Sequence, residues 1–386
     1  MSVRRAVFWA HLSVALAAGL VILTMSVTGV LLTYERQIVA FAERQAFTVP
    51  ASDGARLDAD ALADAARAAL GDDAFLVLTS DGLVKATAGR RATAFLDPTT
   101  GAVMGSGVEG VEAFFRGVTA FHRWFALEGE GRAVARAITG AANLAFLFIV
   151  ISGLVLWWPK RWRWPLVKTH VVFRRGLPTA KARDYNWHHV FGIWASLPLV
   201  LVVASGVVFS YPWANGLVFA LYGETPTRGR PGPQSRPAPA AHPDASGPTA
   251  TTGPLDLDGL LDRLREATLD WRTITVPLGA VGAEAVEATV DTGNGAQAGR
   301  QRTLTLSRAD GSILAERGIE AATPARRARV WLRFIHTGEV YGVLGQTIAG
   351  LASLAAVFLV WTGFALAFRR LIRPLIRRPV AASRSG

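Results

Sequence analysis

The residues of this 386-residue chain best suited to metal or redox chemistry are its histidines, because no cysteine is present. Without cysteine there can be no disulfides, thiolate zinc sites, cysteine nucleophiles, iron–sulfur clusters or covalently attached haem. Four of the seven histidines, His11, His122, His188 and His336, each precede a long apolar stretch. Neutral imidazole is a common ligand of haem iron and other transition metals. These four histidines are therefore the first candidates for a chemical site.

The apolar stretches that must position these histidines are long enough to cross a membrane. A helix needs ~20 residues to cross ~30 Å of hydrocarbon. Four stretches contain no Asp, Glu, Lys or Arg: 12–34, 137–158, 190–222 and 340–368. With 51% hydrophobic and only 18% charged residues, the chain is too apolar for an ordinary soluble protein. The first stretch is longer than the roughly 7–15 apolar residues of a signal peptide, so we expect a retained anchor.

The cations predict how the chain crosses the membrane. Residues 1–12, 159–189 and 369–386 together hold 16 Lys and Arg and one acid, Asp184, so these segments carry a net charge of +15. The whole chain carries +12, so the remaining residues carry −3. Short cytoplasmic segments collect Lys and Arg, so both termini are expected inside and two large loops outside. Because the positive charge flanks apolar spans, it indicates anionic membrane lipid as a partner and argues against nucleic acid.

Two displacements repeat along the chain and indicate a duplication. His11 lies 18 residues before Gly29 (29 − 11), and His188 lies 18 residues before Gly206 (206 − 188). The second His and Gly each lie 177 residues after the first. In the second and fourth spans, Ser152-Gly153 recurs as Thr362-Gly363, 210 residues later. The outer loops repeat too: Leu57-Asp-Ala-Asp-Ala-Leu62 and Leu255-Asp-Leu-Asp-Gly-Leu260 each start an amphipathic helix followed by three short β-like runs. We therefore expect a helix pair plus a small α+β module, present twice.

The predicted topology sorts the histidines into two pairs. His11 and His188 would lie at the cytoplasmic face (the inner pair), and His122 and His336 at the external face (the outer pair). Two imidazoles on different helices of a four-helix core are what a six-coordinate b-type haem requires, so two haems are predicted. His189 is a reserve ligand or a propionate partner, because it points about 100° away from His188 on a helix.

The glycines of the spans would leave room for a macrocycle. Since 18 residues of helix cover ~27 Å, Gly29 and Gly206 are expected beside the outer pair, and Gly153 and Gly363 beside the inner pair. The alternative is structural: histidines at membrane interfaces cap helices or meet headgroups, and small residues in spans mark helix contacts.

The arginines near the outer histidines also have two interpretations. They either meet lipid phosphates or hold haem propionates or an anionic substrate. These arginines are Arg123, Arg132, Arg136, Arg326, Arg327, Arg329 and Arg333.

Several motifs in this order resemble the PepSY-associated transmembrane family. They are Asn186-Trp-His-His-Val-Phe-Gly192, Phe121-His-Arg-Trp124, Ser152-Gly-Leu-Val-Leu-Trp-Trp-Pro159, His336-Thr-Gly-Glu-Val-Tyr-Gly342 and Leu344-Gly-Gln346. The first has His189 where the family has Arg, and the first span lacks the Arg and Gly that usually follow its histidine. Members of the family include inner-membrane ferric-siderophore reductases. The resemblance implies a mainly α membrane protein: a four-helix transmembrane bundle with two periplasmic PepSY-like modules and two b-type haems.

The function that follows is an electron conduit in a bacterial inner membrane that reduces a ferric siderophore or another ferric chelate in the periplasm. No flavin or nicotinamide domain is visible, so the electron donor would be quinol or a separate cytoplasmic reductase. One alternative is a non-enzymatic regulator whose PepSY modules bind a peptide or peptidase. Another is a haem-bearing subunit that serves a different periplasmic reductase.

The expected organisation places nine segments along the chain. These are span 1 (1–36), module 1 (37–108), the outer His helix with span 2 (109–160), a basic cytoplasmic loop (161–185), span 3 (186–222), a Pro/Gly-rich linker (223–254), module 2 (255–320), the second outer His helix with span 4 (321–370) and a basic tail (371–386). His242 in the linker and His170 in the basic loop are expected to have no chemical role, His170 because it would face solvent.

Overall fold

The computed structural model describes residues 2–48, 55–89, 92–159, 161–226, 255–280 and 283–376. Most of the predicted linker, including His242, lies outside these ranges. The chain divides into two compact units. The helical unit consists of Met1–Thr33, Phe115–Val218 and Leu332–Gly386, and the sheet unit consists of Tyr34–Phe114 and Phe219–Trp331.

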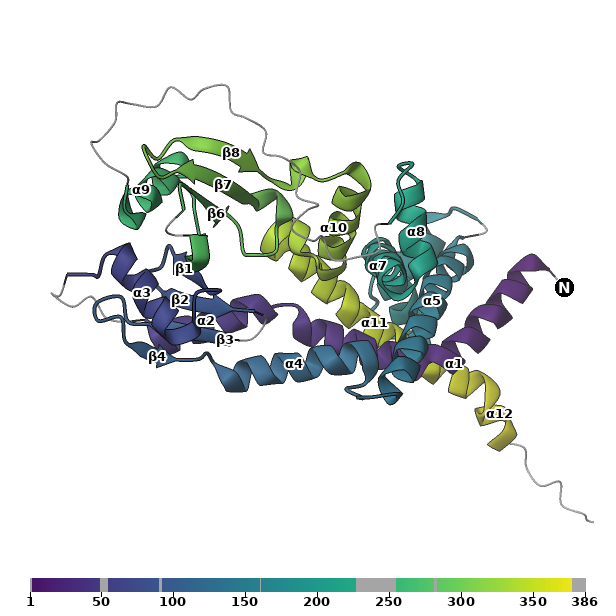
Figure 1. The fold of residues 1–386 in the computed structure, drawn as a ribbon. Helices are drawn as coiled ribbons and strands as arrows, with labels where there is room; N and C mark the ends of the chain where they lie inside the picture. Colours follow the sequence, from purple (N-terminus) through teal and green to yellow (C-terminus); the bar gives the residue numbers. More distant parts are fainter. Residues whose placement is uncertain are drawn as a thin grey trace, which may run out of the picture. The chain divides into compact units, whose positions relative to one another are not determined.

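Four long helices form the helical unit (Figure 1): α1 (Val3–Leu32), α5 (Gly131–Trp157), α7 (Ala180–Ser210) and α11 (Gly342–Leu371). Each packs against two others, in the closed order α1, α5, α7, α11 and back to α1. Each belongs to a helical stretch that is long and apolar enough to cross a membrane. The chain is therefore a membrane protein with four candidate spanning helices, as the sequence predicted.

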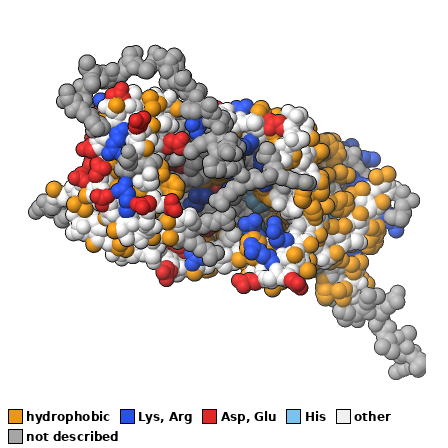
Figure 2. Space-filling model, in the orientation of Figure 1, with side chains coloured by type: hydrophobic (Ala, Val, Ile, Leu, Met, Phe, Trp, Pro, Cys, Tyr) orange, Lys and Arg blue, Asp and Glu red, His pale blue; other side chains and the backbone are white. Residues whose placement is uncertain are grey.

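The contact between α7 and α11 shows why these helices pack closely. Its core consists of small and aliphatic side chains, Ala195, Leu199, Ala352, Ala355 and Ala356. Small residues let helix backbones approach in a bilayer, where apolar burial alone gives little driving force. Large apolar side chains face outward instead and cover much of this part of the surface (Figure 2). A lipid environment requires this distribution, with small residues between the helices and large apolar residues on the surface.

The third span is shorter than the sequence predicted. The uncharged run ends at Tyr222, but α7 ends at Ser210 and α8 (Pro212–Ala220) follows after a break at Tyr211. Proline lacks the backbone N–H that would continue the helix and disfavours helical geometry in the residue before it, so Pro212 explains the break. At its other end α7 begins at Ala180, inside the predicted basic loop, and that loop also contains α6 (Trp164–Val171).

Two amphipathic helices precede the second and fourth spans: α4 (Glu109–Trp124) and α10 (Pro324–Thr337). The turns that follow these two helices differ in which residues take positive φ angles. After α4, Phe125 and Ala126 have positive φ angles of 53° and 55°. After α10 the position is Gly338, with φ +77°, where a Cβ would run into the backbone of Gly345 and Gln346. Only glycine fits this close approach.

The sheet unit is built on one antiparallel sheet of eight strands, in the order β4-β3-β2-β1-β5-β6-β7-β8. The strands are β1 (Phe75–Thr79), β2 (Val84–Ala88), β3 (Ala92–Leu96), β4 (Val103–Gly105), β5 (Thr273–Pro277), β6 (Ala285–Asp291), β7 (Gln301–Ser307) and β8 (Ile313–Arg317). The central pair is β1 and β5, with Val77 opposite Thr275. Each half has the same order, one helix followed by four strands. The sequence did not predict that the two modules share a sheet.

The helices of the two halves, α3 (Ala59–Leu70) and α9 (Leu257–Ala267), pack on the buried core of the sheet. Each begins at an aspartate that caps its own helix, Asp58 or Asp256. The next aspartate of each motif caps the other helix: Asp60 accepts from the amide of Leu257 at 2.9 Å, and Asp258 accepts from the amide of Ala59 at 2.7 Å. The two Leu-Asp-x-Asp motifs therefore join the halves reciprocally.

The remaining elements are short or peripheral. In the sheet unit, α2 (Glu35–Phe47) ends at Phe47, whose ring stacks on Phe95 of β3 at 4.1 Å. Short 3-10 turns occur at Leu278–Ala280, Ala298–Arg300, Ile319–Ala321 and Glu339–Tyr341, and α12 (Arg373–Ile376) follows α11. The sequence predicts β-like runs at 75–79, 83–87, 93–96, 271–276, 285–290 and 302–307. These match β1–β3 and β5–β7 to within two residues at each end, whereas β4 and β8 are not predicted.

Candidate functional site

Each of the four paired histidines is hydrogen-bonded through Nδ1 to a hydroxyl on a different helix of the helical unit. In the inner pair, His11 on α1 meets Ser152 on α5 at 2.9 Å, and His188 on α7 meets Thr362 on α11 at 3.0 Å. The two histidines of the outer pair are hydrogen-bonded in the same way. His122 on α4 meets Thr28 on α1 at 2.7 Å, and His336 on α10 meets Ser205 on α7 at 3.2 Å.

These hydrogen bonds fix which nitrogen of each imidazole carries the proton. Every hydroxyl donates its only hydrogen to a carbonyl of its own helix; Thr28, for example, donates to Thr24 at 2.8 Å, and Ser152, Ser205 and Thr362 do the same. With its hydrogen so placed, the hydroxyl oxygen accepts from the ring. The rings of His11, His122 and His188 also hydrogen-bond to the backbone, at Ile149, Met25 and Leu359 respectively. His336 also donates from Nδ1 to the carbonyl of Val202 at 2.8 Å, and a carbonyl can only accept. The proton is therefore on Nδ1, and Nε2 presents its lone pair.

This arrangement is the one that metal-ligating histidines use. Their second ring nitrogen donates to a protein acceptor, which fixes the ring orientation and strengthens the ligand. The hydrogen bonds from these four rings to the hydroxyls all involve Nδ1. The described part of the chain has no group of three or more His, Asp or Glu side chains that could hold a metal ion. Each histidine pair offers two ligands, the number that haem iron takes from a protein when the macrocycle supplies the other four.

Within each pair, the two histidines are close enough to interact electrostatically. Burial and then the charge of His336 lower the pKa of His122 to about 4, and burial lowers the pKa of His336. Both outer imidazoles are therefore neutral at pH 7, as a ligand to iron requires. The pairs are well separated, because Thr28, which holds His122, lies 17 positions after His11 (28 − 11), and this is ~26 Å along α1.

Three of the four span glycines lie against a paired histidine. A Cβ would lie 3.5 Å from Cε1 of His11 at Gly153, 3.5 Å from Cε1 of His188 at Gly363, and 3.9 Å from Cε1 of His122 at Gly29. The fourth, Gly206, instead contacts the buried amide of Asn143. The glycines therefore leave room beside the imidazole rings, and their part in packing a haem stays a prediction.

His189 points to a different environment from its neighbour His188. Its Nδ1 lies 2.9 Å from the carbonyl of Tyr185, and its ring stacks on His170 at 4.6 Å. His170 is half-buried rather than facing solvent, and burial lowers its pKa. The prediction of a solvent-facing His170 is wrong because α6 packs against α7 and brings the two rings together.

Four of the seven predicted arginines gather within the helical unit. Arg123 and Arg132 lie over the ring of Trp124, with their guanidinium carbons 4.9 Å and 4.0 Å from its centre. Burial, and then the charges of Arg136, Arg132 and Arg333, lower the pKa of Arg123. Arg326, Arg327 and Arg329 belong to the part of α10 assigned to the sheet unit.

The hydroxyl partners were not predicted from the sequence, although a signal for them was present. Each of Thr28, Ser152, Ser205 and Thr362 directly precedes one of the four span glycines. From the sequence, the glycine of each Ser/Thr-Gly pair predicts either free space or a helix contact, and no role is predicted for the hydroxyl. Thr28 and Ser205 recur with the 177-residue displacement of His11 and His188. Ser152 and Thr362 recur after 210 residues (362 − 152), close to the 214 between His122 and His336 (336 − 122), so the two sets could have been paired in advance.

A closed bundle of four candidate membrane-spanning helices with two separated histidine pairs, in a chain that also forms an eight-stranded sheet, defines a class of multi-span membrane protein. The chain belongs to the family described as the PepSY-associated TM region, which it matches over residues 8–370. The resemblance drawn from the motifs is thus confirmed over nearly the whole chain. No curated protein matches it.

Proposed function

We propose that this protein binds two b-type haems and carries electrons across a bacterial inner membrane to reduce ferric chelates, such as ferric siderophores, on the periplasmic side. The observation that carries the proposal is the set of four hydrogen bonds from Nδ1 of His11, His122, His188 and His336 to hydroxyls on other helices. When bound, haem would supply a one-electron Fe(III)/Fe(II) couple. The chain would be an oxidoreductase acting on iron.

The residues have three tasks in this proposal. The inner pair and the outer pair present Nε2 lone pairs, and Ser152, Thr362, Thr28 and Ser205 hold the rings in place. The burial of the outer imidazoles excludes water and keeps them neutral. The glycines beside the rings leave space for a flat group. Axial ligand type, ligand hydrogen bonding and burial are also what set a haem potential.

The proposal includes a topology and an origin. The positive segments at 1–12, 159–189 and 369–386 support cytoplasmic termini, which would put the sheet unit in the periplasm. The repeated order of one helix and four strands supports a duplicated unit with two PepSY-like modules. The donor would be quinol or a cytoplasmic reductase, and the ferric chelate as acceptor rests on the family resemblance.

The first experiment is a reduced-minus-oxidised visible spectrum of the purified full-length protein, with haem quantified per chain. Two low-spin b-type haems per chain are expected. His122→Ala and His11→Ala should each remove one haem, whereas the control His170→Ala should remove none. A haem-free protein from cells able to supply haem would contradict the proposal and leave a PepSY regulator that binds a peptide or peptidase.

A second experiment addresses the acceptor. The reduced protein is mixed with ferric citrate and with ferric hydroxamate chelates, and reoxidation is followed by the loss of the reduced bands. Reoxidation with release of Fe(II) is expected. If two haems are present but no chelate reoxidises them, the protein is a haem-bearing subunit that serves another reductase.

A further inference from the structure

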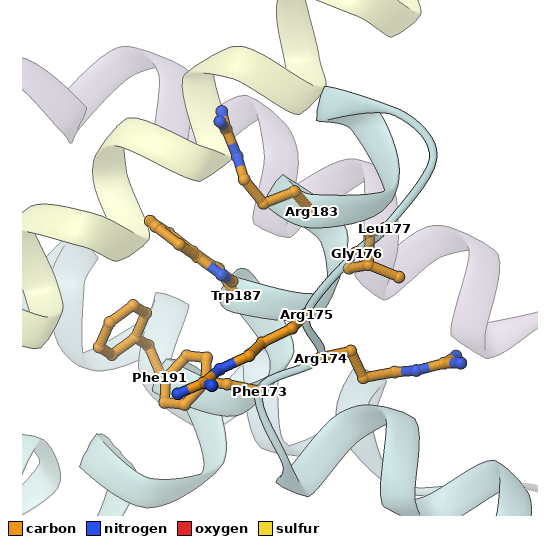
Figure 3. Close-up of a pocket in the computed structure, with 8 residues that line it drawn as sticks. All are labelled: Phe173, Arg174, Arg175, Gly176, Leu177, Arg183, Trp187 and Phe191. Carbon is orange, nitrogen blue, oxygen red and sulfur yellow. The ribbon is translucent and has the colours of Figure 1, made fainter.

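An open cavity of about 490 Å³ lies in the helical unit beside the first turns of α7 (Figure 3). Its wall combines aromatic rings with arginines: Phe173, Trp187 and Phe191, with Arg174, Arg175 and Arg183. The volume is in the range of ordinary ligand sites. The cavity lies outside both histidine pairs, and the proposed function does not use it.

The aromatic side of the cavity is packed in a fixed arrangement. Phe173 meets Phe191 with ring centres 5.0 Å apart and Trp187 at 6.5 Å, both edge to face. Phe191 in turn stacks on Phe358 of α11 at 4.9 Å, nearly parallel. Phe173 is about half exposed, so an apolar surface is available at the mouth of the cavity.

The loop that carries the arginines is held by one buried side chain, Asn186 of α7. Its Oδ1 accepts from the amide of Arg174 at 3.0 Å, and its Nδ2 donates to the carbonyls of Thr169 and Val172 at 2.7 Å and 3.0 Å. Gly176, with φ +67°, then turns the chain back toward α7. The cavity is therefore preorganised, because the backbone of its loop is bonded to a helix.

The charge at the cavity is positive. Arg183 pairs with buried Asp184 at 2.9 Å, but Asp184 also binds Arg369, so these three groups keep one net positive charge. Among the described residues, no carboxylate pairs with Arg174 or Arg175. In Figure 3 the Arg175 side chain extends toward Phe173 and Phe191. A cationic group thus lies beside an exposed apolar surface.

We propose that this cavity binds the phosphate headgroup of an anionic phospholipid. Arg175 would bind the phosphate, Arg174, whose side chain extends away from Phe173 and Phe191, would add positive charge at the cavity wall, and the aromatic rings would contact the glycerol and the first methylenes of the acyl chains. The position supports a lipid, because the cavity lies at the end of a membrane-spanning helix, where headgroups and basic residues meet. The proposal does not depend on haem.

Native mass spectrometry of the detergent-purified full-length protein tests this site. Dioleoyl phosphatidylglycerol should bind in preference to dioleoyl phosphatidylcholine. Arg175→Gln should weaken phosphatidylglycerol binding roughly fivefold, the factor for removing one basic group worth ~1 kcal/mol near an anionic surface. The control Arg163→Gln removes the same charge from an exposed position outside the cavity and should leave binding unchanged.

Three outcomes would overturn the proposal. Equal binding of the two lipids would show that headgroup charge is not recognised. An equal loss in Arg163→Gln would show that the basic surface as a whole attracts lipid. A separate arm adds inorganic phosphate and glycerol phosphate; displacement of the lipid by either, at concentrations equal to that of the lipid, would assign the cavity to a free phosphate instead.

Discussion

The hydroxyl of Thr28 on α1 lies 2.7 Å from Nδ1 of His122 on α4, although 94 residues separate them in the chain. The hydroxyl gives its hydrogen to the carbonyl of Thr24 and accepts from the imidazole, which also hydrogen-bonds to the backbone of Met25. Three further histidines have the same kind of partner. The relationship links histidines at the ends of the bundle to small polar residues inside its membrane-spanning helices.

Replacing the hydroxyl should weaken haem binding without removing a ligand. Thr28→Val keeps the shape of the side chain but removes the hydroxyl acceptor of His122, which leaves the backbone of Met25 as its hydrogen-bond partner. Loss of such a partner typically costs 10–100-fold in metal affinity, so we expect outer-haem affinity to fall by about that factor. Haem titration into the apoprotein measures it.

Two variants control this experiment. Thr28→Ser retains the hydroxyl and should restore affinity. Thr24→Val removes a hydroxyl that donates to the carbonyl of Leu20 in its own helix, and it should have no effect. If Thr28→Val binds haem as tightly as the parent while His122→Ala does not, the hydroxyl does not orient the ligand.

Two glycine substitutions should change stability in opposite directions. Gly338→Ala places a Cβ against the backbone of Gly345 at a positive φ angle, so it should lower the free energy of unfolding by more than ~1 kcal/mol. Gly117→Ala lies inside α4 with no atom within 4 Å of the added Cβ, and it should raise that energy by ~0.5–1 kcal/mol. Thermal unfolding in detergent compares both with the parent. Equal effects would contradict the assigned turn geometry.

The sheet unit should carry a pH dependence that originates at Asp258. Burial raises the pKa of this carboxyl, and the nearby carboxylates of Asp256, Asp58 and Asp60 raise it further. A raised pKa means that the folded state binds the proton more tightly than the unfolded state does. Stability contributed by this group therefore falls as pH rises from the ordinary value of 3.8 through the raised value.

Asp258→Asn should remove this loss of stability at higher pH, and its side-chain oxygen should still accept from the amide of Ala59. Amide hydrogen exchange of peptides from α3 and α9 should be slower than in the parent at pH 7, and the difference should disappear at acid pH. Asp64→Asn, which removes a surface carboxylate paired with Arg67, is the control. Faster exchange in Asp258→Asn at pH 7 would show that the ionised carboxylate stabilises the contact.

The sequence predicted the parts of the fold that depend on neighbours in the chain. Uncharged runs and alternating residues located the four spans and six of the strands, because these are local signals. The pairing of β1 with β5 is not local, since it joins Val77 to Thr275. The break at Tyr211 was missed because the absence of charge was given more weight than Pro212.

The candidate site, too, was predicted only where the signal is local in the sequence. Spacing alone grouped His11 with His188 and His122 with His336, because the repeat places equivalent residues at the same depth. Which of His188 and His189 faces the core could not be decided from spacing. Packing of α6 against α7 decides it by stacking His189 on His170.

Filling the space beside His11 should remove one haem and leave the other. At Gly153 a Cβ would lie 3.5 Å from Cε1 of His11, an ordinary contact, so Gly153→Ala should retain both haems. The additional methyl groups of Gly153→Val extend beyond that distance and must displace the ring. Haem content per chain should then fall from about two to about one, with the outer pair occupied. Gly216→Val on α8, where nothing lies within 4 Å, controls for the added bulk. Retention of two haems in Gly153→Val would mean that His11 is not an axial ligand.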